Sequence, residues 1–191
     1  MKRSEVNGLV QEAAAVFLKH AWALPPEPRW DVTDFGLGEW RRFGLVLINL
    51  ADEAEYCEKL MYAQNGMTTP AHCHARKTED IIARHGVLRI QLWAGKPAAS
   101  EGKLLNLKVN GHEQEFMSGD VIDLQPGWRI KLTPGVYHEF APATEECIIG
   151  EVSTANDDSN DNFFINPMVG RYPEIDEDEP ALVRLVSDVS L

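Results

Sequence analysis

GMTTPAHCHARKTEDIIARHG, residues 66–86, is the stretch that decides the fold of this chain. It places one residue between His72 and His74, and it places Glu79 five residues after His74. A β-strand points alternate side chains to the same face, so these two histidines aim both imidazoles into one space, as a metal ion requires. Cys73 is expected to point away from that space. Because Glu79 is an odd number of residues from both histidines, a turn must separate it from their strand.

A further histidine, His138, follows the turn sequence Pro134-Gly135. In order and spacing, the two histidine-bearing segments resemble the two motifs of the cupin superfamily. The second motif departs from the family pattern, because several extra residues follow Gly119 and Pro142 stands where the family has Asn. The resemblance implies one divalent metal inside a small β-barrel. The metal ligands that it implies are His72, His74, Glu79 and His138.

The organisation of the rest of the chain follows from its periodicities. Apolar residues recur at helical spacing between positions 6 and 18, behind Ser4 as a candidate N-cap, and Pro25 ends the pattern. From position 44 the period becomes that of strands, with Gly and Pro turn signals between them. The predicted strands are residues 44–50, 56–62, 79–83, 87–93, 104–109, 113–116, 120–124, 130–132, 138–141 and 147–153.

These patterns predict one all-β domain over residues 1–191, with a cupin-type β-barrel (jelly roll) and a helix packed outside it. Its expected parts are an N-terminal helical segment at 1–30, the barrel at 43–155 and a C-terminal loop and tail at 156–191. A length of 191 residues with 44% hydrophobic content is enough for one substantial core. The acidic cluster from Asp176 to Glu179 is interpreted as solvated surface.

Charge and cysteine content limit the function classes. A net charge of -12 argues against nucleic acid, whose phosphates need a basic face. The three cysteines, Cys57, Cys73 and Cys147, form neither an even disulfide framework nor a Cys-x-x-Cys pair, so they are interpreted as reduced thiols of a cytoplasmic protein. We expect neither a signal peptide nor a membrane span, because the apolar run at 13–18 is short and polar residues precede it.

The ligand set itself restricts the metal. Three neutral imidazoles and one carboxylate leave two adjacent positions open on an octahedral ion, which suits a substrate that offers two neighbouring oxygens. With no thiolate among the ligands, Mn²⁺ or Fe²⁺ fits better than structural zinc. The other histidines, His20, His85 and His112, are interpreted as ordinary polar residues of the core or the surface.

A closer resemblance appears in the polar residues around this set. The His-x-His-x-x-Lys-x-Glu-Asp core at 72–80 is similar to that of the D-lyxose isomerase family, which consists of cupin sugar isomerases. The segment 42–45 and the C-terminal stretches 150–153, 156–158 and 170–172 extend the similarity over most of the chain. The resemblance implies interconversion of D-lyxose with D-xylulose, and often of D-mannose with D-fructose, with a manganese ion. It leaves the preferred sugar open.

Aldose–ketose exchange moves a proton between C1 and C2 through an enediol, so it needs an electrophile at the oxygens and a base near the carbons. Lys77 is the candidate hydrogen-bond donor or proton shuttle, and Glu151 is the candidate general base. A solvated turn lysine and a surface strand glutamate are the alternatives. The acidic run that ends at Asp161 suggests a loop that closes over a polyol, or a solvated loop. The predicted substrate-binding residues are Asp157, Asp158 and Arg171.

Two other functions are compatible with the same ligands. An Fe²⁺ oxygenase would use the same three histidines and glutamate, and a binding cupin would sense a sugar without converting it. The sequence has no helix-turn-helix segment through which a sensor would act on DNA. A homodimer is the default symmetric assembly, and Trp22, Trp30 and Trp40 would suit its interface.

Overall fold

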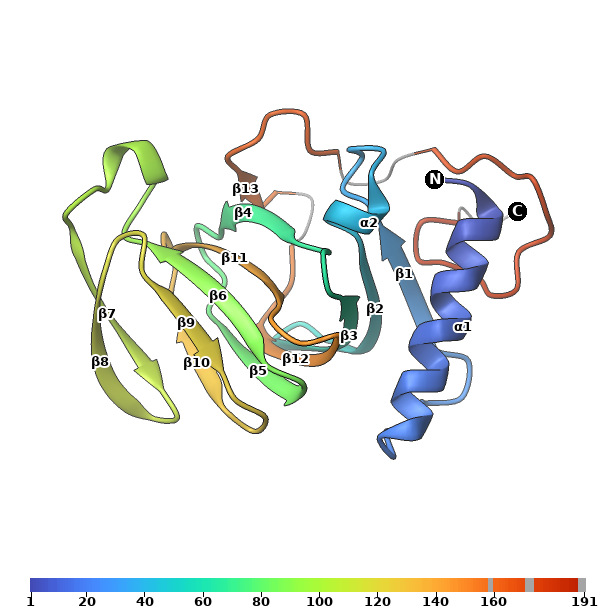
Figure 1. The fold of residues 1–191 in the computed structure, drawn as a ribbon, viewed down its shortest axis with the longest axis horizontal. Coiled ribbons are helices and arrows are strands. Elements are labelled where there is room, and N and C mark those ends of the chain that lie inside the picture. Colours follow the sequence, from blue (N-terminus) through green and yellow to red (C-terminus); the bar gives the residue numbers. More distant parts are fainter. Residues whose placement is uncertain (158–159, 171–173, 189–191) are drawn as a thin grey trace.

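The computed structural model describes residues 1–157, 160–170 and 174–188, and it consists mainly of β-strands, with one long helix at the N-terminus (Figure 1). The helices are α1 (Arg3–Lys19) and α2 (Trp40–Phe43), with a short 3-10 helix at Pro97–Ala99. The strands are β1 (Arg29–Thr33), β2 (Leu45–Asp52), β3 (Tyr56–Gln64), β4 (Thr69–Cys73), β5 (Glu79–His85), β6 (Leu88–Trp93), β7 (Leu104–Val109), β8 (His112–Met117), β9 (Val121–Leu124), β10 (Arg129–Leu132), β11 (Tyr137–Pro142), β12 (Glu146–Thr154) and β13 (Phe163–Phe164).

The strands form two sheets, and each strand pair among the described residues is antiparallel. The larger sheet has the order β1-β2-β3-β12-β5-β10-β7-β8, and the smaller has the order β13-β4-β11-β6-β9. Alternate side chains of both sheets are buried, as in β6, where Leu88, Ile90 and Leu92 point into the core. The sheets and the outer helix in Figure 1 give the all-β, cupin-type architecture that the sequence predicts.

Helix α1 covers the face of the larger sheet that points away from the barrel interior. Its Phe17 ring lies 6.4 Å from the Trp30 ring of β1 and 6.5 Å from the Tyr62 ring of β3. Successive strand residues face opposite sides, so Tyr62 meets the helix while its neighbour Met61 lines the internal cavity. The helix therefore packs outside the barrel, as its apolar stripe predicts.

Three details of this region differ from the sequence predictions. The helix begins at Arg3 after Lys2 as N-cap, and Ser4 lies within its first turn, where its hydroxyl donates to the Asp178 carboxylate. Leu18, the last residue of the predicted apolar pattern, is 79% exposed in the final turn of the helix. Trp30 is buried within this chain against α1, so it does not form part of an exposed interface.

The acidic segment near the C-terminus is exposed, as predicted, but it also binds the start of α1. Glu177 forms an ion pair with the buried Arg3 at 2.6 Å, and Asp178 accepts hydrogen bonds from the backbone and side chain of Ser4. Carboxylates close to a helix N-terminus are favoured by the helix dipole. The segment thus fixes the first turn of α1.

The turn between β5 and β6 depends on Gly86, which has a φ of +73°. A Cβ atom there would press against the backbone oxygen of Glu146 and lie 2.9 Å from Cys147 Sγ. We expect Gly86→Ala to lower the free energy of unfolding by roughly 2 to 4 kcal/mol, from the left-handed backbone and the overpacking together. Urea unfolding measures this loss.

Gly111 is the matched control, because its φ is +85° and nothing lies within 4 Å of the position of a Cβ. Gly111→Ala should cost only about 1 kcal/mol, from backbone strain alone. Equal losses in the two variants would contradict the role of the contacts around Gly86.

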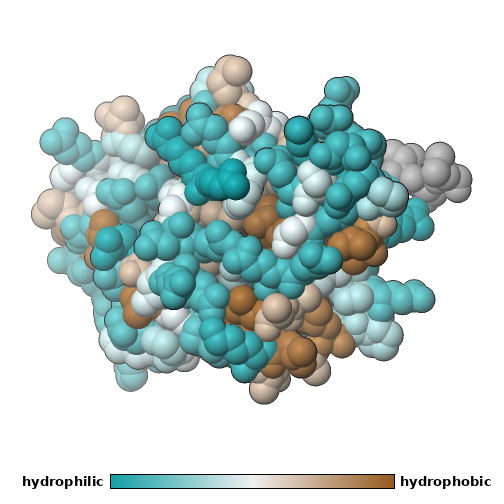
Figure 2. All heavy atoms as spheres, turned by 45° about the vertical axis from the view of Figure 1, so that its right-hand side comes forward, coloured by the Kyte–Doolittle hydropathy of each residue, from teal (hydrophilic) through white to brown (hydrophobic). Residues whose placement is uncertain are grey.

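Hydrophilic side chains predominate on the face shown in Figure 2, and the largest group of apolar residues gathers at its lower edge. Over the described ranges, no helix combines the length and the apolar character that crossing a bilayer requires. Cys57, Cys73 and Cys147 are buried free thiols, as their number and spacing predict.

Candidate active site

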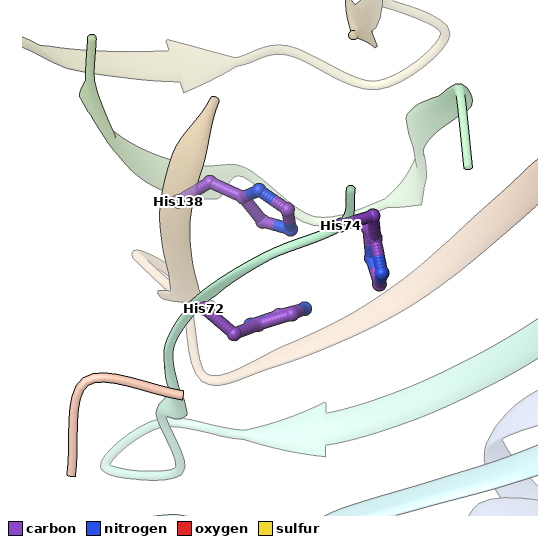
Figure 3. A group of neighbouring side chains, drawn as sticks. All are labelled: His72, His74 and His138. Atoms are coloured by element: carbon purple, nitrogen blue, oxygen red, sulfur yellow. The ribbon is translucent and has the colours of Figure 1, made fainter. Parts of the chain in front are cut away.

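Three imidazoles converge between β4 and β11, which are neighbours in the smaller sheet. The register places His72 opposite His138, so both side chains point to the same face, and His74 follows just after β4. One ring nitrogen from each histidine lies within 4.8 Å of the others. Figure 3 shows the three rings directed toward one common space. The His-x-His spacing therefore produces the convergence that the sequence predicts.

Glu79 reaches the same space from the larger sheet. It is the first residue of β5, and a bend at 75–76 supplies the turn that its odd spacing requires. Its Oε1 lies 3.0 Å from His138 Nε2, and its Oε2 lies 3.4 Å from His74 Nε2. Cys73 does not line this cavity, consistent with a side chain that points away from the histidines.

Backbone oxygens determine which nitrogen of each ring carries the hydrogen. The Nδ1 atoms lie 2.8 Å from the Pro70 oxygen for His72, 2.8 Å from the Asp161 oxygen for His74, and 3.2 Å from the Val136 oxygen for His138. A carbonyl oxygen only accepts, so Nδ1 carries the hydrogen in each ring and the Nε2 lone pair is left for a ligand bond.

The atoms at the centre of this group lack hydrogen-bond partners among the described residues. His74 Nε2, His138 Nε2 and Glu79 Oε1 are buried and unsatisfied. Burial, reinforced by the neighbouring histidines, lowers the pKa of His72 well below its ordinary value, which keeps that imidazole neutral. Lone pairs that face one another in a buried space are costly unless a cation lies between them, so these residues fit a divalent metal.

A buried lysine that is paired with two glutamates lies beside the three histidines. Lys77 Nζ is 2.8 Å from Glu79 Oε2 and 2.9 Å from Glu151 Oε1. Burial opposes the charge of Lys77, but Glu151 and Glu79 outweigh it and raise the pKa of the lysine above its ordinary value. Burial likewise opposes the charge of Glu79, but the Lys77 ammonium holds its pKa well below the usual range. Lys77 is therefore an ammonium donor that fixes two carboxylates, and Glu151 faces the cavity with it.

Sequence reasoning missed Lys59, a buried lysine on β3 that lines the same cavity. It lies opposite Glu151 in the β3–β12 register, and its Nζ is 3.7 Å from Glu151 Oε1 and 3.3 Å from Asn156 Oδ1. A lysine within a mainly apolar strand was the available signal, because such a charge is buried only when it is paired.

Asp161 binds the segment between β4 and β5, which carries His74 and Lys77. Its carboxylate accepts the backbone N–H groups of Ala75 at 2.9 Å, Arg76 at 3.1 Å and Lys77 at 2.9 Å. Burial opposes its ionisation, but these N–H donors outweigh it and lower the pKa of Asp161. Because its own backbone oxygen also lies 2.8 Å from His74 Nδ1, Asp161 positions the His74 ring as well as this segment.

Of the three predicted substrate-binding residues, the structure describes only Asp157. The carboxylate of Asp157 accepts a hydrogen bond of 2.6 Å from the exposed Arg76 side chain, and Asp157 does not line the cavity. Asp158 and Arg171 lie outside the described residues. The role of all three in sugar binding stays a prediction.

The cavity around the site has a volume of about 130 Å³, well above what one water molecule needs. Its polar side holds the histidines, Lys77, Glu79, Glu151 and Lys59, together with Asp31 and Asn162. Its apolar side includes the rings of Phe35 and Phe164, and the Phe164 ring stacks on His72 at 5.1 Å. A small ligand with polar groups on one side would suit this lining.

The fold is shared with solved sugar isomerase structures. The L-ribose isomerase of Cellulomonas parahominis superimposes with a TM-score of 0.67 over 92% of this chain and 98% of that chain, at 16% sequence identity. The L-ribose isomerase of Geodermatophilus obscurus gives a TM-score of 0.64 at 19% identity, over 88% of this chain and 94% of that chain. At these identities the likeness establishes the architecture.

Sequence comparison establishes the family. The family model described as D-lyxose isomerase matches residues 27–189. A D-lyxose/D-mannose isomerase of Escherichia coli O157:H7 is 33% identical over 98% of both chains. A D-lyxose ketol-isomerase of Cohnella laeviribosi is 30% identical over 94% of this chain and 100% of its own length. The chain therefore belongs to the D-lyxose isomerase family, a family of sugar isomerases.

Proposed function

We propose that this protein is a metal-dependent aldose–ketose isomerase that acts on free sugars, converting D-lyxose to D-xylulose and also D-mannose to D-fructose. The names of the relatives from Escherichia coli O157:H7 and Serratia proteamaculans, both D-lyxose/D-mannose isomerases, support these substrates. One observation carries the chemistry. The buried Lys77–Glu151 pair lies against the group of three histidines and Glu79, within one cavity.

The metal would be held by His72, His74, Glu79 and His138, and a ligand set without thiolate favours Mn²⁺. When bound, the ion supplies Lewis-acid stabilisation of the negative charge that develops on the sugar oxygens. The Lys77 ammonium would add a second positive charge near the sugar oxygens, since its hydrogen bonds to Glu79 and Glu151 place it beside the ligand group. A water-poor cavity strengthens both effects.

The proton transfer is assigned to Glu151. Its carboxylate takes the proton from C2 of the open-chain aldose and returns it to C1, while the hydroxyl proton of O2 moves to O1. The C1 aldehyde thereby becomes an alcohol and the C2 alcohol becomes a ketone, with no gain or loss of atoms or electrons. Lys77 orients Glu151 for this transfer by its hydrogen bond of 2.9 Å.

The rest of the sugar would be bound by the remaining cavity residues. Lys59, Asp31 and Asn162 present polar groups to the hydroxyls, and the apolar wall around Phe35 covers the carbon chain. Asp157, Asp158 and Arg171 keep their proposed role at a distal part of the sugar.

We further propose a homodimer that works in the cytoplasm. The three buried free thiols suit a reducing compartment, and a two-fold dimer is the commonest symmetric assembly. Size-exclusion chromatography with light scattering tests the dimer.

Membership in a family of sugar isomerases favours this reaction over the Fe²⁺ oxygenase and over the sugar sensor. The deciding experiment incubates the Mn²⁺-loaded protein with a panel of free aldoses and assays ketose. We expect D-xylulose from D-lyxose, D-fructose from D-mannose, and loss of both products after chelation, with recovery on adding Mn²⁺. Oxygen consumption without ketose would point instead to the oxygenase, and tight sugar binding without product would point to the sensor.

A further inference from the structure

A second group of metal-binding side chains lies outside the active-site cavity. It consists of His20, His85 and Glu146, each half-buried. His20 directly follows the last residue of α1, His85 ends β5, and Glu146 begins β12. Strands β5 and β12 are neighbours in the larger sheet, and α1 runs along the outside of that sheet (Figure 1). The fold therefore brings one ligand from each of three elements to a single place.

The geometry of the three residues suits one ion. The imidazole rings of His20 and His85 are stacked, with centroids 3.5 Å apart and an interplanar angle of 27°. His20 Nε2 lies 3.7 Å from Glu146 Oε1, and one donor atom of each residue lies within 4.8 Å of the others. His20 Nε2 is buried and has no hydrogen-bond partner among the described residues. A cation between these atoms would satisfy that nitrogen and use the carboxylate.

The surrounding charges also favour a cation. The site lies at the C-terminal end of α1, where the helix dipole attracts positive charge. The Lys19 ammonium already supplies one positive charge here, because its Nζ lies 3.0 Å from Glu146 Oε1. The Lys19 side chain is 65% exposed, so the pair is weak and easily displaced.

We propose that His20, His85 and Glu146 form a second metal site, selective for a late divalent transition metal such as Zn²⁺. Two imidazoles and one carboxylate are a common ligand set for zinc, and the affinity of nitrogen and oxygen sites for divalent ions rises toward the later transition metals. An ion there would link the end of α1 to the β5–β12 pair. Its role would be structural, since none of the three residues lines the active-site cavity.

Zinc stoichiometry, measured by calorimetry and elemental analysis, tests the proposal. A background with the active-site ligands replaced, His74→Gln with His138→Gln, isolates the second site. We expect that background to bind one equivalent of Zn²⁺ and to gain thermal stability from it, and we expect no binding after His85→Gln is added. In the wild-type active-site background, His20→Gln with His85→Gln should keep isomerase activity and lose one zinc equivalent. His112→Gln, on the exposed side of β8, is the control and should bind as its parent does.

Lys19→Ala gives a test in the opposite direction. Removing the competing ammonium should tighten zinc binding about twofold to fivefold, the range expected for loss of one exposed ion pair. Glu146→Gln should weaken it roughly tenfold or more, because the only anionic ligand is lost. These two variants keep the proposal testable if a histidine variant does not fold.

Two results would overturn the proposal. One is a His74→Gln/His138→Gln protein that is folded by circular dichroism and binds no zinc. The other is zinc binding that Lys19→Ala and Glu146→Gln leave unchanged, which would place the ion elsewhere. Neither result bears on the isomerase proposal, which depends on ketose formation.

Discussion

Replacing Glu151 with glutamine is expected to lower kcat for ketose formation by roughly 10²- to 10⁴-fold, the usual contribution of a positioned general base. Glutamine is nearly isosteric with glutamate and retains an oxygen that can accept from Lys77, which lies 2.9 Å away, but it cannot take a proton. KM should change much less than kcat. Steady-state kinetics with D-lyxose, together with exchange of the C2 hydrogen with solvent, measure both effects.

Glu139 provides a matched control for this substitution. It follows His138 on β11, is half-buried, and does not line the cavity. Glu139→Gln should retain the kcat of the wild-type protein. If Glu151→Gln also retained it, the proton transfer would have to be assigned to a different residue.

Replacing His138 with glutamine is expected to have a comparably large effect, through the metal. The Nε2 of His138 lies 3.0 Å from Glu79 Oε1 at the centre of the ligand group. Loss of this imidazole removes one of four ligands, so Mn²⁺ affinity should fall by at least about tenfold and kcat/KM by roughly 10³-fold or more. Mn²⁺ binding followed by electron paramagnetic resonance, and ketose formation at fixed metal, measure the two losses.

His112→Gln is the control here too, because His112 is exposed on β8 and far along the sheet from the cavity. It should leave Mn²⁺ binding and turnover unchanged. A His138→Gln protein that bound Mn²⁺ as tightly as the wild type would refute the ligand set.

Local spacing predicted the convergence of the histidines well, because alternate residues of a strand point to the same face. His72 and His74 are two residues apart, and the β4–β11 register then places His138 opposite His72. Glu79 and Glu151 share one inward face, since the β5–β12 register pairs Ser153 with Glu79 and Glu151 with Ile81. Lys77, which lies two residues before Glu79 and just outside β5, also points inward and meets Glu151. The ten predicted strands all appear, each within two residues of its predicted ends.

Contacts between segments that are distant along the chain were not predictable in the same way. Strand β1 was missed because it lies before position 44, where the strand periodicity begins, and only its register with β2 makes it a strand. The pairing of Lys59 with Glu151 depends on the β3–β12 register, which no local pattern encodes. The acidic cluster looked like free surface, because nothing near it in the sequence reveals Arg3 as its partner. The stacking of His20 on His85 arises only when α1 packs on the sheet.

The hydrogen bonds between Asp161 and the segment after β4 have a consequence for the order of events during protein synthesis. The motif at 66–86 leaves the ribosome long before Asp161 does, yet the backbone N–H groups of residues 75–77 bind the Asp161 carboxylate and the His74 ring binds its carbonyl oxygen. A nascent chain that ends before this aspartate contains His72, His74, Glu79 and His138 but lacks the hydrogen bonds that position the His74 ring and the segment after it. If the site binds a metal as proposed, the ion should therefore bind only after the chain has been synthesised past Asp161.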